Sequence, residues 1–162
     1  MSTTDSRPVR EAIRVEAATT GRKPPWSIYG DRIYLLLSGK ETAGGFTVME
    51  DHTLAGTGPP WHVHHREDEL FQVLEGKYVF QVRDRRIEAK VGDLIMIPKD
   101  NPHSFQNVGP TTGRTLITVQ PSGIEFFFEE LAALTGPPDM AKVAAVFIKH
   151  GLELLGPPLD LR

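Results

Sequence analysis

The sequence predicts an all-β domain of the barrel or sandwich type, followed by a short helical appendage. From Trp26 to Pro121 the chain is a series of short apolar runs separated by turn residues, which is typical of such β folds. After Pro121 the apolar residues change to helical spacing. We expect one domain, with an N-terminal arm at 1–25, a β-barrel at 26–121, and C-terminal helices with an extended tail at 122–162 that packs on the barrel.

The strands are expected where apolar runs lie between turn signals. They cover residues 32–37, 45–54, 70–74, 77–82, 86–89, 93–97, 105–108 and 114–119. Glu75-Gly76 predicts a hairpin turn, and Asp84-Arg85-Arg86 predicts a charged one. The run at 94–97 is apolar on both faces, so we expect a partner chain or the C-terminal segment to cover it.

Two helices are expected after the barrel. Apolar residues at helical spacing predict the first, over residues 123–135, and the Gly136-Pro137-Pro138 sequence ends it. Phe127 and Phe128 are expected to dock this helix on the barrel. Asp139 is a suitable N-cap for a second helix that runs to about His150, and the tail from residue 152 onward is expected to be extended.

Composition indicates an ordinary soluble protein and excludes several functions. Hydrophobic residues make up 40% and charged residues 24% of the chain, and the net charge is -3. Because no basic run is present, we expect neither nucleic acid nor a membrane surface as a partner. The absence of cysteine excludes thiol catalysis, so any metal must be bound by imidazole and carboxylate groups. The polar start lacks the hydrophobic region of a signal peptide, so a cytoplasmic protein is expected.

Three histidines and a glutamate form the one group that suggests chemistry. Residues two apart on a strand face the same side, so His62 and His64 should project together while Val63 points away. A further strand or bend is expected to bring Glu69 back to the two histidines, and His103 must come from a different strand. These donors suit one divalent iron, nickel, cobalt, manganese, copper or zinc ion per chain. On a six-coordinate ion they leave two positions for substrate, water or dioxygen, whereas a four-coordinate zinc site would be full and structural.

Each of these residues has an ordinary alternative interpretation. A single histidine is usually a surface or core residue, and His52 and His150 are interpreted in this way. His65 has the opposite parity to His64 and is expected to point outward. The acidic run that includes Glu67 would, taken alone, indicate a solvated turn. The metal-site hypothesis depends on the two segments occurring together.

The two segments resemble the paired motifs of the cupin superfamily. Gly56, His62, His64, Glu69 and Gly76 match its first motif, G-x5-H-x-H-x3,4-E-x6-G. The second motif is G-x5-P-x-G-x2-H-x3-N, and the residues that match it are Gly92, Pro98, His103 and Asn107. The resemblance implies a single cupin-type β-barrel, a jelly-roll-like double-stranded β-helix.

Asp100 departs from the second motif, because it stands where glycine is usual. Asp tolerates the left-handed backbone conformation better than most residues, so we expect the turn to be kept.

A finer resemblance is to single-domain, quercetin-dioxygenase-like cupins. It is carried by Gly-Pro-Pro-x-His-x-His before Glu-Asp-Glu-x-Phe-x-Val-Leu-Glu-Gly, and by Pro-x-Gly-x-Glu-x-Phe-Phe after the barrel. It implies that Glu69 is a metal ligand that also contacts the substrate hydroxyl. Gln72 stands where such sequences often have Tyr, but its parity directs it away from the metal. The resemblance and the apolar strands also imply a homodimer.

Three functions stay open at this point. The first is a metal-dependent dioxygenase of small enolic or phenolic, flavonol-like substrates, in which Glu69 takes the substrate proton. The second is a non-redox metalloenzyme, such as an isomerase, lyase or hydrolase. The third is a module that binds a small ligand without catalysis. Aromatic and apolar residues near the site are the candidates for a substrate pocket: Trp61, Phe71, Tyr78, Phe80 and Phe105.

Overall fold

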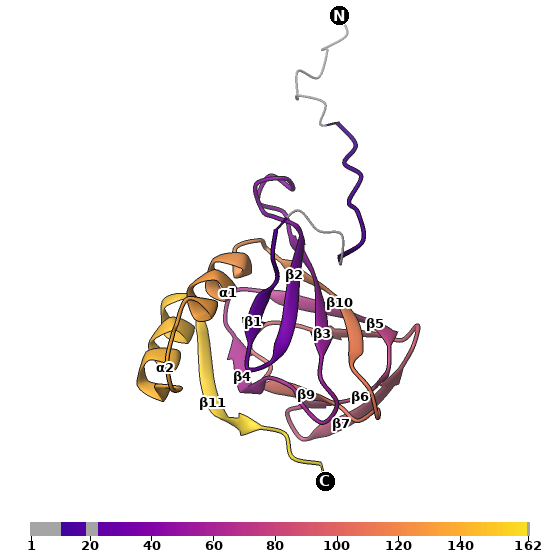
Figure 1. Ribbon diagram of the computed structural model, residues 1–162, viewed down its shortest axis with the longest axis vertical. Helices are drawn as coiled ribbons and strands as arrows, with labels where there is room; N and C mark the ends of the chain where they lie inside the picture. The colour runs from indigo at the N-terminus through magenta and orange to yellow at the C-terminus, as the bar shows by residue number, and fades with distance from the viewer. Residues whose placement is uncertain (1–10, 19–22, 162) are drawn as a thin grey trace, which may run out of the picture.

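The computed structural model describes residues 11–18 and 23–161, which form two antiparallel sheets and two helices (Figure 1). The strands are β1 (Trp26–Ile28), β2 (Asp31–Leu37), β3 (Thr47–Thr53), β4 (Pro60–His64), β5 (Asp68–Glu75), β6 (Lys77–Val82), β7 (Arg85–Lys90), β8 (Leu94–Ile97), β9 (His103–Asn107), β10 (Gly113–Gln120) and β11 (Leu152–Pro158). The helices are α1 (Ile124–Ala132) and α2 (Met140–Lys149). This is a mostly β, jelly-roll-like fold with two sheets and short C-terminal helices, as the sequence predicts.

The first sheet has the order β1-β2-β3-β10-β5-β8 and the second β11-β4-β9-β6-β7. Side chains alternate across each strand, so every second residue enters the space between the sheets. In β10, for example, Thr115, Ile117 and Val119 are buried while the residues between them are partly exposed. The inward apolar side chains from both sheets form one core that includes Met49, Phe71, Phe80 and Phe105.

Gly76 is a corner between the sheets, so the predicted hairpin at Glu75-Gly76 is wrong. β5 pairs with β10 and β8, whereas β6 pairs with β7 and β9. Gly76 has a positive φ of 92°, which lets the chain turn from one sheet into the other. The charged hairpin does form, but its turn residues are Arg83 and Asp84, because Val82 pairs with Arg85.

The C-terminal segment does not cover β8, so this one of the two expected alternatives is wrong. β11 pairs with β4 at the edge of the second sheet, whereas β8 is an edge of the first. On β8, Ile95 and Ile97 are buried, but Leu94 and Met96 keep 60% and 55% of their surface exposed. A partner chain on this face, and hence a homodimer, stays a prediction.

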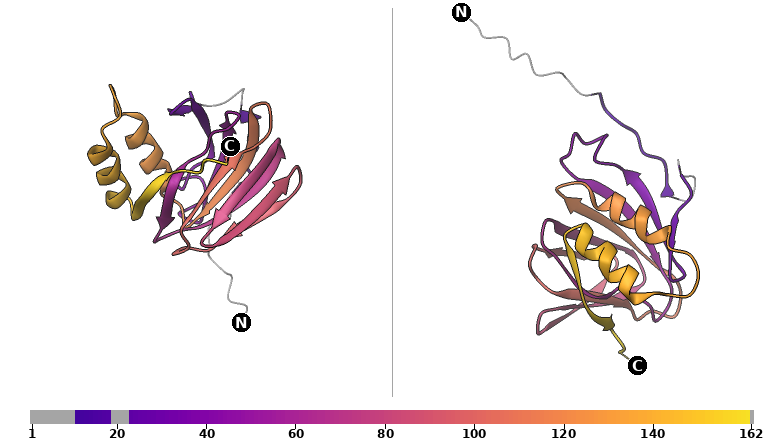
Figure 2. Two further views of the ribbon diagram at one scale, coloured as in Figure 1. Left: turned by 90° about the horizontal axis from the view of Figure 1, so that it is seen from below. Right: turned by 90° about the vertical axis from the view of Figure 1, so that its left-hand side faces the viewer.

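Both predicted helices are present, and they lie side by side along one side of the barrel (Figure 2). Asp139 caps α2 by accepting hydrogen bonds from the backbone N–H groups of Ala141 and Lys142. Phe127 of α1 is buried and packs edge-on against Phe147 of α2, with ring centroids 4.9 Å apart. Phe128 stacks on Trp26 of β1, which fixes α1 against the first sheet. In the part of the chain that is described, neither helix has the length and apolar character needed to cross a membrane.

Candidate metal centre

The two segments singled out in the sequence meet between the sheets. β4 carries His62 and His64, and β9 carries His103 directly opposite His62 in the ladder. Glu69 faces them from β5 in the other sheet. All four side chains are buried, and one ligand atom from each lies within 4.8 Å of the other three. The structure therefore brings together all the residues that the sequence suggests as metal ligands.

Each histidine ring is oriented by an acceptor at Nδ1. The partners are the Pro60 carbonyl oxygen at 2.7 Å for His62, the Asn101 carbonyl oxygen at 2.9 Å for His103, and Glu67 Oε2 at 3.3 Å for His64. Because carbonyl and carboxylate oxygens only accept, each Nδ1 must carry the proton. In the neutral rings, Nε2 is then left with a free lone pair, the form in which imidazole binds a metal.

The atoms at the centre of the group are close together without being hydrogen-bonded. His103 Nε2 lies 2.8 Å and His64 Nε2 lies 3.4 Å from Glu69 Oε2. Among the described residues, however, neither Glu69 Oε2 nor His103 Nε2 has a partner in hydrogen-bond geometry. A buried polar atom without a partner is costly. These two atoms are therefore suited to a shared positive ion.

Burial and the neighbouring side chains shift the pKa values of the group. Burial alone would raise the pKa of Glu69, but attraction to His64 and His103 in their protonated forms outweighs it and holds this pKa at about 2. Burial and the neighbouring His103 and His64 lower the pKa of His62 to about 3, so this ring is neutral at physiological pH. Burial lowers the pKa of His103, but the Glu69 carboxylate opposes this more strongly and raises it.

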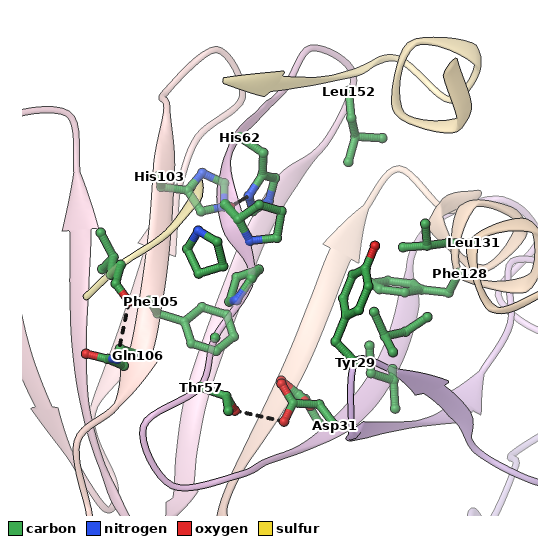
Figure 3. Close-up of a pocket in the computed structure, with 18 of the residues that line it drawn as sticks. Tyr29, Asp31, Thr57, His62, His103, Phe105, Gln106, Phe128, Leu131 and Leu152 are labelled. Atoms are coloured by element: carbon green, nitrogen blue, oxygen red, sulfur yellow. Dashed lines mark hydrogen bonds between the residues drawn. The ribbon is translucent and has the colours of Figure 1, made fainter. Parts of the chain in front are cut away.

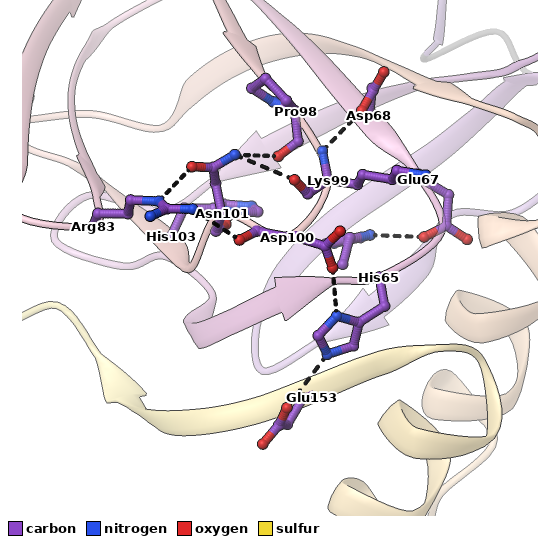
Figure 4. Close-up of polar contacts among 11 residues, drawn as sticks. His65, Glu67, Asp68, Arg83, Pro98, Lys99, Asp100, Asn101, His103 and Glu153 are labelled. Atoms are coloured by element: carbon purple, nitrogen blue, oxygen red, sulfur yellow. Dashed lines mark hydrogen bonds and ion pairs between the residues drawn. The ribbon is translucent and has the colours of Figure 1, made fainter.

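Glu67 is a candidate functional residue that the sequence interpretation missed. It was assigned to a solvated acidic turn, yet it is 5% exposed and accepts the hydrogen bond from His64 Nδ1. The sequence signal for this role is that Glu67 follows His64 by three residues. His65, by contrast, points away from the centre as predicted and contacts Asp100 and Glu153 at the surface (Figure 4).

Asp100 keeps the turn that the second motif requires. Its φ of 63° lies in the left-handed region, so the expectation for this departure from glycine is confirmed. Its backbone N–H donates to the His64 carbonyl oxygen at 2.8 Å, which ties the turn before His103 to the strand that carries the other two histidines.

A cavity of about 590 Å³ opens onto the four residues (Figure 3). This volume is in the range of small-molecule sites. Most of the lining is apolar, including Ile33, Phe71, Phe105, Ile117, Phe127 and Phe147. Two groups of polar side chains also line the cavity. One consists of His62, His64, Glu69 and His103, and the other of Asp31, Asp51 and Thr57.

Two of the five predicted pocket residues line this cavity, Phe71 and Phe105. The other three do not, and their assignment is corrected. Trp61 has the opposite parity to His62 and packs toward Gly156 on the outside of the barrel. Tyr78 and Phe80 do point inward, but they are 1% and 0% exposed, and the Phe105 ring packs against both of them. The alternation of side chains along a strand shows on which face a residue lies, but it does not show how far along the barrel that residue is from the cavity.

Comparison with known families agrees with this geometry. Residues 51–119, which include all four candidate ligands, match the family model described as Cupin domain. The barrel has the cupin fold, and residues 51–119 are similar to the cupin domain family. Over 48 residues the chain is 35% identical to an uncharacterized protein of Methanocaldococcus jannaschii, a match that covers 30% of this chain and 38% of that relative. The chain thus covers well under half of the curated relative.

Solved structures share the cupin fold at low sequence identity. An RmlC-like cupin from Shewanella frigidimarina superposes with a TM-score of 0.58 at 18% identity, over 73% of this chain and 99% of that one. KdgF from a Halomonas species gives 0.55 at 14%, over 61% and 86%. A protein from Thermotoga maritima, described as a predicted oxalate decarboxylase, gives 0.54 at 23%, over 56% and 80%. At these identities the similarity establishes the fold alone.

The residues of this candidate centre fit a divalent transition metal. Three imidazole nitrogens and one carboxylate, with no thiolate, suit the ions from manganese to zinc. The oriented rings and the two unpartnered atoms supply the donor directions that such an ion needs. The identity of the ion does not follow from the donors.

Proposed function

We propose that this cupin is a metal-dependent dioxygenase that acts on a small enolic or phenolic substrate. The observation that carries the proposal is the position of a buried three-histidine, one-glutamate group on the wall of a mostly apolar cavity. When bound, a redox-active ion would supply the activation of dioxygen and the binding of the substrate oxygen. Both atoms of dioxygen enter the product, so the substrate provides the electrons and no further reductant is needed.

The apolar walls would select and shield the substrate. Phe71 and Phe105 would offer ring faces and edges to a planar molecule in the cavity. Phe127 and Phe147, from the two helices, also line the cavity, and the Phe147 ring lies edge-on to the His62 ring, with centroids 6.1 Å apart. These buried rings would exclude water from the cavity. Exclusion of water strengthens the electrostatic contacts at the reacting end and protects reactive species from hydrolysis.

Glu69 is assigned first as a ligand. Burial would raise the pKa of Glu69, but the neighbouring histidines outweigh it and hold this pKa low, so the carboxylate is suited to hold positive charge at the centre. The hypothesis that Glu69 also takes the substrate proton stays a prediction.

The direct test is oxygen uptake by the metal-loaded chain. The protein is loaded separately with iron, nickel, cobalt, manganese or copper, checked for about one ion per chain, and assayed with a panel of flavonols and simple enols. We expect one dioxygen consumed per substrate cleaved with at least one ion. A fully loaded chain that consumes no oxygen across the panel contradicts the proposal. Turnover that continues after oxygen is removed would favour a non-redox metalloenzyme.

A neighbouring histidine provides the matched control. His62→Ala removes a candidate ligand and should abolish both metal binding and uptake. His65→Ala changes an exposed ring three residues along the chain that contacts Asp100 and Glu153 at the surface, and it should retain both. Equal loss in the two variants would show that uptake depends on the general integrity of the barrel rather than on the candidate centre.

A further inference from the structure

A second polar group lies in the same cavity, away from the metal centre. Asp31, at the start of β2, and Asp51, on β3, both line the cavity together with Thr57. Figure 3 places His62 and His103 toward one end of the cavity, Asp31 and Thr57 toward the other, and Phe105 between them. The metal centre uses neither aspartate, and neither belongs to the two sequence motifs.

Asp31 is held in place by the protein. Its Oδ1 accepts hydrogen bonds from the backbone N–H of Leu54 at 2.8 Å and from the Thr57 hydroxyl at 2.9 Å. These bonds tie the carboxyl group to the loop that leads into β4. Asp31 therefore presents a fixed negative end to the cavity.

Asp51 is buried and only partly satisfied. It is 5% exposed, and its Oδ2 accepts a hydrogen bond from the Thr53 hydroxyl at 3.0 Å. Within the described parts of the chain, 11–18 and 23–161, its other oxygen, Oδ1, has no hydrogen-bond partner. An unpartnered, buried carboxyl oxygen is unfavourable for folding, which argues for a use in binding.

The two carboxyl groups also act on each other. Burial, followed by the charge of Asp31, raises the pKa of Asp51 to about 7. Burial also raises the pKa of Asp31, although its hydrogen bonds from Leu54 and Thr57 oppose the shift. A ligand group that donates a hydrogen bond would relieve both the unpartnered oxygen and the negative charge.

We propose that Asp31 and Asp51 form a second anchor of the cavity, which binds a hydroxyl group at the end of the substrate remote from the metal centre. The substrate class is then a mostly apolar molecule with polar groups at both ends: oxygen atoms that bind the metal, and a phenolic or alcoholic O–H that donates to the Asp51 carboxyl group. This inference rests on the proposed function only in treating the cavity as the substrate site.

The test uses small probes that need neither metal nor oxygen. Phenol, anisole and toluene are titrated into the metal-free full chain, and binding is followed by NMR through the carboxyl carbon resonances of Asp31 and Asp51. Phenol can donate a hydrogen bond, whereas anisole and toluene have a similar shape without a donor. One hydrogen bond corresponds to roughly a tenfold preference for phenol. We expect that preference together with a shift of the Asp51 resonance.

Variants at Asp51 decide the outcome. Asp51→Leu keeps the size and removes both oxygens, so phenol and toluene should bind equally. Should that variant fail to fold, Asp51→Asn keeps one acceptor oxygen without the charge, and the preference should fall severalfold. Glu50→Gln is the matched control, because Glu50 lies next to Asp51 on β3 but contacts His52 and Arg114 instead of lining the cavity. It should keep the preference.

Three results would overturn the proposal: equal binding of the probes by the natural chain, an unchanged preference for phenol in a folded Asp51 variant, or no binding of phenol. None of them depends on oxygen uptake. If the chain prefers phenol as expected but consumes no oxygen, the second anchor is supported and only the dioxygenase proposal is contradicted.

Discussion

His103 Nε2 and Glu69 Oε2 lie 2.8 Å apart, although His103 belongs to β9 in one sheet and Glu69 to β5 in the other. The candidate metal centre thus joins the two sheets through side chains alone. A bound ion would replace a contact between two unpartnered buried atoms with four donor bonds that cross the core. Metal binding should therefore affect stability as well as chemistry.

Metal removal should lower the melting temperature. Free metal at about 100 times its dissociation constant stabilises the folded state by about 2.7 kcal/mol, which corresponds to roughly 5–10 °C for a chain of this size. Thermal unfolding followed by circular dichroism, with and without a chelator, measures the difference. In His103→Ala the difference should disappear. A full metal-dependent rise in that variant would mean that the ion binds elsewhere.

Glu67→Ala should weaken metal binding without removing a ligand. The Glu67 carboxylate accepts the His64 Nδ1 hydrogen bond at 3.3 Å and so orients that ring. Loss of such a partner typically costs 10–100-fold in metal affinity. Competition with a chromophoric chelator measures the affinity. The neighbouring Asp68→Ala serves as control, because Asp68 accepts from the backbone N–H of Lys99 (Figure 4) and not from a ligand. Equal affinities for Glu67→Ala and the natural chain would contradict the orienting role.

Asp51→Asn should stabilise the protein at alkaline pH and not at acidic pH. The pKa of Asp51 rises from 3.8 in the unfolded chain to about 7 in the folded one. Between these values the folded state binds more protons, so its stability falls as the pH rises, and above about pH 7 the whole penalty is present. We expect a gain of roughly 2–4 kcal/mol at about pH 8 and almost none at about pH 4. Urea unfolding at both pH values measures it, and an equal gain at both would refute the assigned pKa.

Gly58→Ala should destabilise the loop that leads into β4. A Cβ atom at this position would overlap the backbone carbonyl of Phe105, which cannot move without disturbing β9. Overpacking of this kind costs about 1–3 kcal/mol. Gly56→Asn is the comparison, because Gly56 has a φ of 77° but open space around its Cβ position. Asn tolerates that conformation, so the free energy of unfolding should change by less than about 1 kcal/mol. The reverse order of the two losses would contradict this account.

Much of the candidate centre follows from the sequence because strand periodicity is strict. The spacing of His62 and His64 fixes their common direction, and the outward direction of His65 follows from the same rule. The left-handed turn at Asp100 follows from local sterics. These features depend on neighbouring residues only.

The features that the sequence did not reveal depend on distant parts of the chain. A turn residue such as Gly76 does not say whether the strands on either side pair with each other. Glu67 is 5% exposed and hydrogen-bonded to His64, which its place in an acidic run does not reveal. The inward direction of Asp51 follows from the alternation of side chains on β3. Its proposed binding role, however, depends on Asp31 and on the cavity that both residues line.

Because β11 pairs with β4, the candidate metal site is completed only after β11 has been synthesised. Leu152 and Leu154 lie beside His64 and His62 in the ladder, so the strand that carries two of the candidate ligands is flanked by a segment made about ninety residues later. Until that segment leaves the ribosome, β4 keeps one row of backbone donors and acceptors unpaired. A nascent chain would therefore contain every ligand residue well before the rigid site exists, and metal capture belongs to the finished fold rather than to its early intermediates.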